Sequence, residues 1–565
     1  MKRLLSALLL TIFITGLTLG LSACKGEEES NTFPLLRVDG TKIVDGSGQE
    51  VFLRGVNVGG ISAIEQWMNG FSKSSSEDSD ITCIDHATTT RVFVERFGKE
   101  LTKEIWAEYK RNWFNDYDFQ NCVDMGINVL RLPFTYMDLD FDAILNLDDG
   151  GKAYDFAFLD EFIGKCRDYG LYVILDMHGA YGSQNGKDHS GEVFGAGKVD
   201  FYSNQQKIQL TADLWKAIAE RYKDEPTIAG FDLMNEPAET TGSGTLTTTD
   251  RHFLVFDKIY DAIRSTGDNH IIFFEACWSA NDLPMPHEYG WENCVYSFHH
   301  YTGTDDFNSH TSNYTSRMKE ITEKGFGVPI YIGEFTCYNN YDSWDYTLAL
   351  MNGQGLSWTS WTYKVNATSV MPWGVYNIKV ESGQKINAHN DSYDEIIAKI
   401  RKLSTKENAK AFTFSNQKTL ASVIKKYALA GGSADFGGGN YYIRTSDYKS
   451  IKIAEENGAG TFFVVKGEDK WDGPSFRIVK SKGQSKWVEF KTGGGYLSAD
   501  TKYGTPVLTL TNKEENCQFL LLSGEYGYKI LSYDAKKFLT YYEDENKFYF
   551  TASYNEAEDF IIEKA

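Results

Sequence analysis

The chain has 565 residues, 42% of them hydrophobic, and a formal net charge of −21 at pH 7. This length suits two or three domains, and the apolar fraction excludes a chain that is disordered throughout. The negative charge argues against nucleic acid or an anionic membrane surface as a partner, whereas a neutral polymer such as a polysaccharide is compatible with it.

The first 37 residues have the pattern of an export signal followed by a tether. Met-Lys-Arg precedes an apolar run over residues 4–21, which is typical of a signal peptide rather than a membrane span. Leu-Ser-Ala-Cys then resembles the bacterial lipobox, and this resemblance implies lipidation of Cys24. An ordinary cleaved signal with an incidental Cys is the alternative. We expect a signal peptide over residues 1–23 and an acidic tether over residues 24–37. The protein would then be a bacterial lipoprotein of the outer membrane, displayed at the cell surface and touching the membrane only through its anchor.

Residues 38–403 alternate short apolar strands with amphipathic helical patterns, which indicates an α/β fold with a parallel sheet buried on both faces. The predicted strands are Val51–Val56, Asn128–Pro133, Leu171–Met177, Ala229–Met234, His270–Ala276, Cys294–His299, Pro329–Phe335 and Gly355–Thr362. Eight such units predict a (β/α)8 TIM barrel with loop insertions. A doubly wound open sheet is the alternative. That fold requires a helix directly after the glycine-rich turn of the first strand, and no helix is predicted after the glycines at 55–60.

The pattern of apolar and polar residues changes after residue 403. Residues 404–430 are predicted as a linker with a short helix at Leu420–Ala428, and glycine clusters follow it. Residues 431–565 alternate apolar and polar residues and contain a weak threefold repeat, closed by Ser475-Phe476, Gln518-Phe519 and Asp559-Phe560. Three units of this size predict a smaller all-β domain, a β-trefoil, similar to fascin-like or lectin-like trefoils. A β-sandwich is the alternative, and we expect the aromatic residues of this domain to pack in its core.

Polar side chains fall at or near the C-terminal ends of six predicted strands, where a (β/α)8 barrel carries its active site. They are Arg131, His178, Asn235, Glu236, His299, Tyr301, Glu334 and Trp361. Barrel interiors are filled by aliphatic residues, so ionisable groups there need partners or a purpose. Hydrolysis of a glycosidic bond needs one protonated carboxyl and one carboxylate, which the fourth and seventh strands would supply as Glu236 and Glu334. For either glutamate alone, an ion pair at the barrel rim is the alternative.

Most of residues 38–400 resemble glycoside hydrolase family 5, the cellulase-like group of clan A. The matching motifs are Phe-Leu-Arg-Gly-Val-Asn at 52–57, Gly-Ile-Asn-Val-Leu-Arg-Leu-Pro at 126–133, Asn-Glu-Pro at 235–237 and Gly-Glu-Phe at 333–335. The resemblance implies a retaining hydrolase with Glu236 as acid/base and Glu334 as nucleophile, which forms a covalent glycosyl-enzyme intermediate. It also implies that Trp361 stacks under the sugar at the cleavage point.

The neighbours of the two glutamates have expected roles. We expect Arg131 and Tyr301 to bond to Glu334 and hold it ionised. Asn235 is suited to the sugar 2-hydroxyl. His178 and His299 would donate to sugar hydroxyls or to Glu334, and His299 would help to set the protonation of Glu236. We also expect the negative charge of Glu334 to raise the pKa of Glu236.

The substrate is less determined than the chemistry. His-Gly-Ala-Tyr-Gly-Ser-Gln-Asn-Gly at 178–186 is similar to the exo-β-1,3-glucanase branch of the family, which implies a β-1,3-glucan. The loops after Pro237 and Phe335 depart from that branch, so mannan, xyloglucan, cellulose and glycolipid are alternatives. A non-catalytic surface glycan-binding lipoprotein is the rival function. We expect no cofactor and no metal. A barrel enzyme of another class, such as a metal hydrolase, is a further rival, but the adjacent His299 and His300 point opposite ways on a strand and are poor joint ligands. We also expect a monomer.

Overall fold

The structure is a computed structural model. It describes residues 33–565, except 78, 195–198, 238–249, 277–278, 367–371, 430–438, 456–461, 481–486, 502–504, 513–515, 524–526 and 552–555. The expected signal peptide, Cys24 and most of the expected tether therefore lie outside the described residues. Within the described part of the chain, no helix combines the length and apolar composition that a membrane crossing needs.

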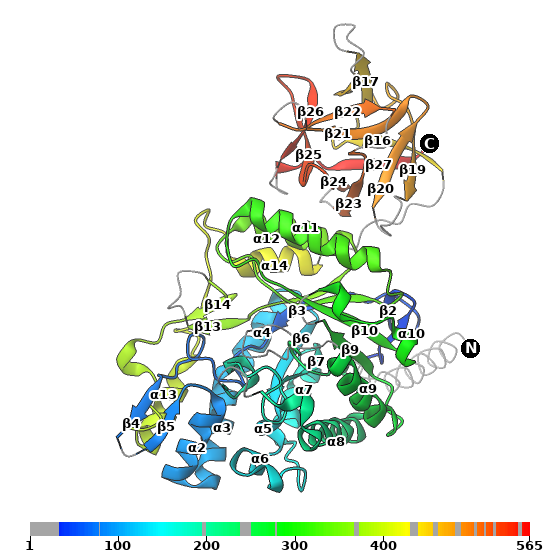
Figure 1. Cartoon of the computed structure of the whole chain (residues 1–565). Coiled ribbons are helices and arrows are strands. Elements are labelled where there is room, and N and C mark those ends of the chain that lie inside the picture. The colour runs from blue at the N-terminus through cyan, green and yellow to red at the C-terminus, as the bar shows by residue number, and fades with distance from the viewer. Residues whose placement is uncertain are drawn as a thin grey trace, which may run out of the picture. The chain divides into compact units, whose positions relative to one another are not determined.

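Eight parallel strands close into a barrel (Figure 1). In chain order they are β3 (Arg54–Asn57), β6 (Val129–Thr135), β7 (Tyr172–Gly179), β8 (Ile228–Asp232), β9 (Ile271–Glu275), β10 (Cys294–His300), β11 (Ile330–Phe335) and β12 (Ser357–Ser360). Each strand pairs with its neighbours in the chain, and β12 pairs with β3 to close the ring. The (β/α)8 barrel predicted from the sequence is confirmed, and each of its eight strands lies where an apolar run predicts it.

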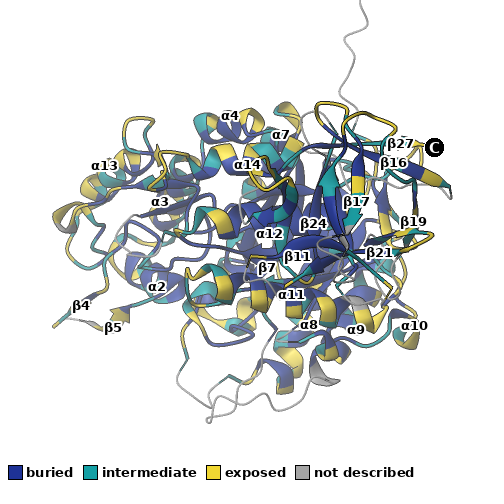
Figure 2. Cartoon of the chain, turned by 90° about the horizontal axis from the view of Figure 1, so that it is seen from above, coloured by how far each residue is buried: buried dark blue, intermediate teal, exposed yellow. Residues whose placement is uncertain are grey.

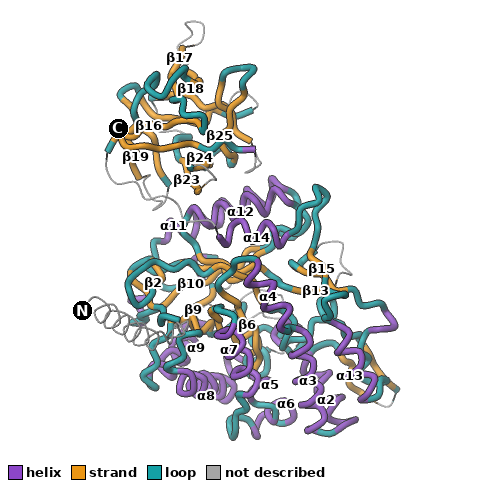
Figure 3. Tube along the Cα trace, turned by 180° about the vertical axis from the view of Figure 1, so that it is seen from behind, coloured by secondary structure: helices purple, strands orange, loops and turns teal. Residues whose placement is uncertain are grey.

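Helices surround the barrel strands, as the purple and orange segments of Figure 3 show. They are α2 (His86–Phe97), α3 (Lys99–Trp113), α4 (Asp116–Asp124), α5 (Tyr136–Leu139), α6 (Asp142–Leu145), α7 (Ala157–Asp168), α8 (Gln205–Tyr222), α9 (Asp250–Arg264), α10 (Pro286–Tyr289), α11 (Phe307–Lys324), α12 (Tyr341–Gly353) and α13 (Tyr393–Leu403). Because they cover the outer face of the sheet, β6 and β7 are buried along their whole length. In Figure 2 the barrel strands near β7 and β11 are accordingly dark blue, and exposed residues lie on the surrounding helices and loops.

Smaller sheets flank the barrel, and the segment expected as a linker is ordered. The short strands are β1 (Arg37–Asp39), β2 (Lys42–Val44), β4 (Ser74–Ser76), β5 (Ser79–Cys83), β13 (Lys364–Asn366), β14 (Tyr376–Ile378) and β15 (Lys410–Ala411). Residues 404–430 contain β15, which pairs with β14, and α14 (Leu420–Leu429). The backbone carbonyl of Tyr427 in α14 accepts hydrogen bonds from Arg54 and Asn352, so this helix is fixed to the barrel.

The C-terminal domain has three units of four strands each in its described residues. The units are β16 (Asn440–Thr445), β17 (Ile451–Glu455), β18 (Phe462–Lys466) and β19 (Phe476–Lys480); β20 (Val488–Thr492), β21 (Gly495–Asp500), β22 (Val507–Thr511) and β23 (Phe519–Ser523); and β24 (Tyr528–Ser532), β25 (Lys537–Tyr542), β26 (Lys547–Thr551) and β27 (Phe560–Lys564). The first and last strands of the units pair in the closed order β16-β19-β20-β23-β24-β27. The middle strands form three hairpins. These pairings are those of a β-trefoil, and the repeated Phe476, Phe519 and Phe560 are fully buried in it.

The tightest backbone approach in the barrel gives a stability prediction. A Cβ added at Gly55 in β3 would lie 1.8 Å from the carbonyl oxygen of Val129 in β6, whereas one added at Gly164 in α7 meets nothing within 4 Å. We expect Gly55→Ala to lower the free energy of unfolding by about 1–3 kcal/mol or more, because backbone must move. Gly164→Ala, the control, should raise it by about 1 kcal/mol through helix propensity. Thermal unfolding checks both, and equal midpoints for the two variants would contradict the steric argument.

Candidate active site

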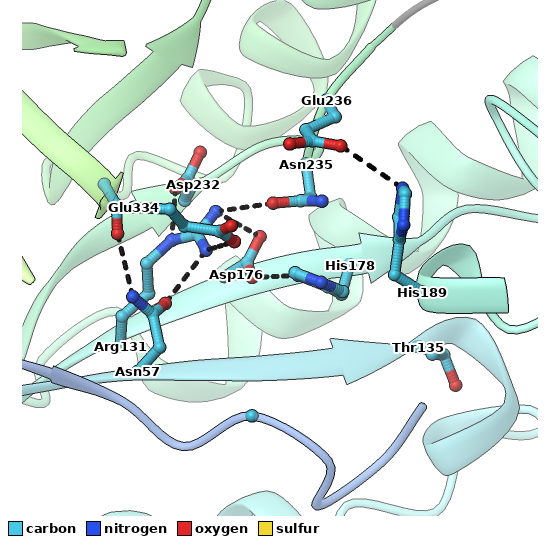
Figure 4. Close-up of polar contacts among 12 residues, drawn as sticks. Asn57, Arg131, Thr135, Asp176, His178, His189, Asp232, Asn235, Glu236 and Glu334 are labelled. Atoms are coloured by element: carbon cyan, nitrogen blue, oxygen red, sulfur yellow. Dashed lines mark hydrogen bonds and ion pairs between the residues drawn. The ribbon is translucent and has the colours of Figure 1, made fainter. Parts of the chain in front are cut away.

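A single guanidinium occupies the centre of the barrel mouth. Arg131, on β6, is fully buried, and its side chain donates to Oε1 of Glu334 at 2.8 Å and to Oδ1 of Asn235 at 3.1 Å. It also donates to Asp232 at 2.9 Å and lies 3.0 Å from Asp176 (Figure 4). A planar group with five N–H donors is suited to this work, because it can bond to several acceptors in fixed directions.

The two glutamates expected to be catalytic face each other. Glu334 lies on β11 and Glu236 follows β8, and one carboxyl oxygen of each lies within 4.8 Å of the other. The second oxygen of Glu334 accepts a hydrogen bond from the hydroxyl of Tyr301 at 2.6 Å. A retaining glycosidase separates its two carboxyl groups by roughly 5–5.5 Å, whereas an inverting one leaves room for a water between them. The short separation therefore matches direct attack by one carboxylate.

Three histidines surround this pair, two of them predicted. His299, on β10, places Nδ1 3.1 Å from Oε1 of Glu236 and 3.5 Å from Oε2 of Glu334. His178, on β7, places Nδ1 2.7 Å from Asp176, and its ring lies parallel to that of Trp361 with centroids 5.3 Å apart. All eight side chains predicted for the site are thus linked by contacts at one end of the barrel.

The third histidine, His189, was not predicted from the sequence. His189, in the short 3-10 helix η2 (Asp188–Ser190) after β7, places Nε2 3.3 Å from Oε2 of Glu236. It lies well beyond the end of its strand, so the rule that active-site residues follow barrel strands directly does not reach it. Its position within the segment at 178–190, which continues the motif around His178, was the only available signal.

Three buried acidic residues of the barrel interior were also not predicted from the sequence. Asp176, Asp232 and Glu275 lie inside the barrel and are 1% exposed or less. One arginine cannot neutralise all of them, so burial raises the pKa of Asp176 to about 7 and that of Asp232 to about 6. Burial likewise raises the pKa of Glu275 well above its usual range. The signal for these residues was an acidic side chain within an apolar strand, which needs a partner or a purpose.

The pKa of Glu236 differs from the value expected from the sequence. Burial raises the pKa of Glu236, but the hydrogen bond with His299 and the electrostatic effect of the neighbouring histidines lower it to about 2. Burial lowers the pKa of His299, but Glu275, Glu334 and Glu236 together raise it to about 9. The expected rise at Glu236 is therefore wrong for the site without substrate, because His299 is closer to this carboxyl than the expectation allowed. The pair holds its proton on His299.

Side-chain amides of the loop after β7 fix the backbone at the acid/base. Glu236 has a φ of 43°, in the left-handed region that a residue with a Cβ adopts at a cost. Gln184 donates to the carbonyl oxygen of Asn235 at 2.7 Å, and Asn185 donates to that of Glu236 at 3.2 Å. The strained peptide is thus held by hydrogen bonds from another strand's loop.

Aromatic rings line the approach to Glu334. Trp373 lies 5.6 Å from Tyr301, 5.4 Å from Trp67 and 4.9 Å from Tyr338, measured between ring centroids. Together with Trp361, which stacks on His178, these rings offer apolar faces near the carboxylate pair. Such faces suit the C–H surface of a sugar ring.

Among the residues that the structure describes, two groups of side chains have the spacing of metal ligands. They are Glu236, His299 and Glu334, and Glu65, Asp188 and His189. The first group is the carboxylate pair with its histidine, and the reaction of two carboxyl groups on a glycoside needs no metal. The second lies beside it. Acidic residues gathered at a site mouth are not by themselves a metal site.

A closed (β/α)8 barrel with two opposed glutamates at strand ends, one bound by a buried arginine and a tyrosine, defines the glycoside hydrolase class. Residues 94–367 match the family model described as cellulase (glycosyl hydrolase family 5). The match covers just under half of the chain and lies within the barrel, which is therefore a glycosyl hydrolase family 5 domain.

Named relatives share part of the chain. It is 28% identical over 360 residues to a beta-xylosidase from Phanerodontia chrysosporium, covering 58% of this chain and 70% of that protein. It is 30% identical over 264 residues to a glucan 1,3-beta-glucosidase from Candida oleophila, covering 44% and 58% of the two chains. A probable glucan 1,3-beta-glucosidase A from Neosartorya fischeri is 28% identical, covering 50% of this chain and 65% of that protein. The chain thus spans about two thirds of the length of such relatives.

Solved structures also align with the chain. An endogalactoceramidase matches with a TM-score of 0.44 and 14% identity, covering 94% of this chain and 100% of that one. A beta-glucanase from Saccharophagus degradans matches with a TM-score of 0.38 and 18% identity, covering 59% and 85%.

The geometry of Arg131 predicts that a positive charge alone at this position is not sufficient for catalysis. Lysine has one nitrogen and cannot bond at once to acceptors on several strands. We expect Arg131→Lys to lower kcat/KM for a glycoside substrate by on the order of 10²-fold or more, because Glu334 loses its orientation. The control is Arg111→Lys, which alters an exposed pair with Glu161. Enzyme assays of purified folded variants check this, and near-normal activity of Arg131→Lys would contradict it.

Proposed function

We propose that the protein is a retaining β-glycosidase that cleaves β-glucosidic bonds in a β-glucan through a covalent glycosyl-enzyme intermediate. The observation that carries the proposal is the pair of carboxyl groups, with oxygens within 4.8 Å, contributed by non-neighbouring strands of one closed barrel. In this mechanism Glu334 attacks the anomeric carbon while Glu236 gives a proton to the leaving oxygen. Glu236 then removes a proton from water, and that water releases the sugar.

The surrounding side chains support these two roles. Both oxygens of Glu334 accept hydrogen bonds, one from Arg131 and one from Tyr301, which fixes the carboxylate for attack. Asn235 is held by Arg131 beside the same carboxylate, in place to meet the sugar 2-hydroxyl. Trp361 and His178 present stacked rings that would support the sugar.

The proton for the leaving group is shared by Glu236 and His299. Because the pKa of His299 is about 9 and that of Glu236 about 2, the resting pair carries one proton on the imidazole. Acid catalysis requires this proton on Glu236, a transfer across the 3.1 Å contact. Formation of the bond to Glu334 removes a nearby negative charge, so that Glu236 can then act as base.

A β-1,3-glucan is the substrate that we propose first. The relatives named glucan 1,3-beta-glucosidase and the segment at 178–186 favour it. The relative named beta-xylosidase makes a β-xyloside the second candidate. A panel of β-linked oligosaccharides, with products identified by mass and linkage, distinguishes them.

We also propose that the enzyme is an outer-membrane lipoprotein displayed at the cell surface. The support is the sequence alone: a basic start, an apolar run and Leu-Ser-Ala-Cys ending at Cys24. Metabolic labelling with a fatty acid, lost in Cys24→Ala, tests this proposal.

The carboxylate pair gives the central prediction. We expect Glu334→Gln and Glu236→Gln each to lower turnover of an oligosaccharide by on the order of 10³-fold or more, because one loses the nucleophile and the other the acid. Proton NMR of the wild-type reaction should show the β-anomer as the first product. Glu161→Gln, at an exposed position, is the control. Undiminished hydrolysis by Glu334→Gln, or an α-anomer as first product, would contradict the mechanism.

The shared proton gives a pH prediction. With His299 present, the pair keeps one proton until the pH passes about 9, so kcat/KM should fall as pH rises through that value. In His299→Asn the proton must be held by the carboxyl alone, whose ordinary pKa is about 4.3. We expect the alkaline limb of kcat/KM to move down by at least about one pH unit in this variant. His287→Asn, on the exposed α10, is the control, and superimposable profiles for all three proteins would refute the shared proton.

A further inference from the structure

One tryptophan of the C-terminal domain lies at its surface. Trp487 is 1% exposed, as expected for an aromatic residue of a small β domain, but Trp471 is 62% exposed and departs from that expectation. Trp471 lies in the loop between β18 and β19. The corresponding loop of the second unit, residues 512–518, contains no aromatic residue, so the trefoil fold itself does not require one at this position.

The loop that carries Trp471 is held in place by hydrogen bonds. The backbone N–H of Trp471 donates to Oδ1 of Asp469 at 2.7 Å. The carbonyl oxygen of Asp469 accepts from the backbone N–H of Ser450 at 3.0 Å and from its hydroxyl at 2.8 Å. The backbone of Gly473 lies so close to β17 that an added Cβ would be 2.0 Å from the carbonyl oxygen of Ile451. Because the loop is already ordered, a ligand that binds to the indole does not incur the entropic cost of ordering it.

A buried arginine packs against the indole and fixes its direction. Arg444, on β16, is 1% exposed, and its side chain donates a hydrogen bond to Glu563. Its guanidinium lies over three aromatic rings, and the distances to their centroids are 4.9 Å for Tyr442, 5.3 Å for Trp471 and 5.9 Å for Tyr448. The rings of Tyr442 and Trp471 meet edge to face, with centroids 5.7 Å apart. The three rings and the guanidinium therefore form one packed cluster.

Two rings of this cluster present apolar surface to solvent. Trp471 is 62% exposed and Tyr448 is 46% exposed, although both contact the buried arginine. The ammonium group of Lys470 also lies over the indole, 4.8 Å from its centroid. Lys470 is itself exposed, and a cation over a ring contributes little at an exposed site, so a ligand can displace it. The cluster thus offers aromatic surface in a fixed orientation.

The polar groups around the rings suit a neutral ligand with many hydroxyls. Arg444 is paired with Glu563, and Lys452 is paired with Asp472 at 3.2 Å, so these charges do not require an ionic partner. Paired carboxylates and ammonium groups still have lone pairs and N–H donors for hydroxyl groups. The flat C–H surface of a sugar ring matches an exposed indole face. Two exposed rings are also a much smaller surface than the roughly 1,000 Å² of a stable protein interface.

We propose that Trp471 and Tyr448, held by Arg444, form a glycan-binding site in the C-terminal domain that takes a β-linked polysaccharide. The inference rests on the proposed function, because the ligand is the polymer that the barrel would cleave. A chain with a catalytic site and a second glycan site can hold a long polymer at both, which strengthens binding without any new contact at the scissile bond. An oligosaccharide that fills only the barrel site gains nothing from the second site.

The test measures binding and hydrolysis separately. In the full-length chain carrying Glu334→Gln, we measure depletion of the protein from solution by insoluble β-1,3-glucan, cellulose and xylan. Adding Trp471→Ala should weaken binding to the preferred polymer about tenfold, because one of two linked sites is lost. Trp471→Phe keeps an aromatic face and should weaken it less than about threefold. With Glu334 present, the ratio of the rate on the polymer to the rate on a short oligosaccharide should fall about tenfold in Trp471→Ala.

The controls separate a specific site from a general surface effect. Tyr542→Ala is the matched control, because Tyr542 lies on β25 of the same domain and is 51% exposed, and this variant should bind as its parent does. Circular dichroism reports that all variants are folded. Equal binding of Trp471→Ala and its parent to every polymer, or an equal loss in Tyr542→Ala, would overturn the site and leave the proposed function intact.

Two further outcomes identify other errors. Loss of self-association in Trp471→Ala, with glycan binding unchanged, would show that the rings contact a second copy of the chain and would overturn the glycan site. Glycan binding that depends on Trp471, in a chain that hydrolyses no β-glycoside, would overturn the proposed function and support the site.

Discussion

The site depends on one buried guanidinium that ties four strands of the barrel together. Arg131 on β6 bonds to Glu334 on β11 and to Asp232 on β8, and it pairs with Asp176 on β7. Burying such charges is costly, and the cost is offset only if the geometry is exact enough for each partner to be reached. A closed ring of parallel strands supplies that geometry, because its register fixes the height at which every strand end presents its side chain.

Most of the fold, and the eight central residues of the site, were predictable from the sequence for physical reasons. Strands buried on both faces read as continuous apolar runs, so all eight were found, and the polar residues that interrupt their ends stood out. The trefoil followed from Phe476, Phe519 and Phe560, because a threefold core places the same residue type at the same depth in each unit. In the linker segment the helix at 420–429 was visible as a pattern, but its bonds to the barrel were not.

What the sequence did not reveal depends on distances between segments. Asp176 and Glu275 were hidden within strands that looked like ordinary core, and only the closed barrel shows that they surround one arginine. His189 lies in a loop, and the hydrophobic periodicity that predicts helices and strands does not predict the conformation of a loop. The pKa of Glu236 was expected to rise because Glu334 carries a negative charge, whereas the hydrogen bond with His299, at 3.1 Å, lowers it. The sign of a pKa shift follows the nearest partner, which sequence spacing does not give.

The barrel and the loop after β7 therefore both position the acid/base residue, Glu236. The barrel sets the position of β8, but the peptide that follows it turns into the left-handed region at Glu236, which the strand itself does not stabilise. Gln184 and Asn185 donate hydrogen bonds to the carbonyls of Asn235 and Glu236 at this turn. One loop thus fixes the backbone of the acid/base residue. The nucleophile is instead held by Arg131 and Tyr301, so the two catalytic carboxyl groups are positioned by separate sets of contacts.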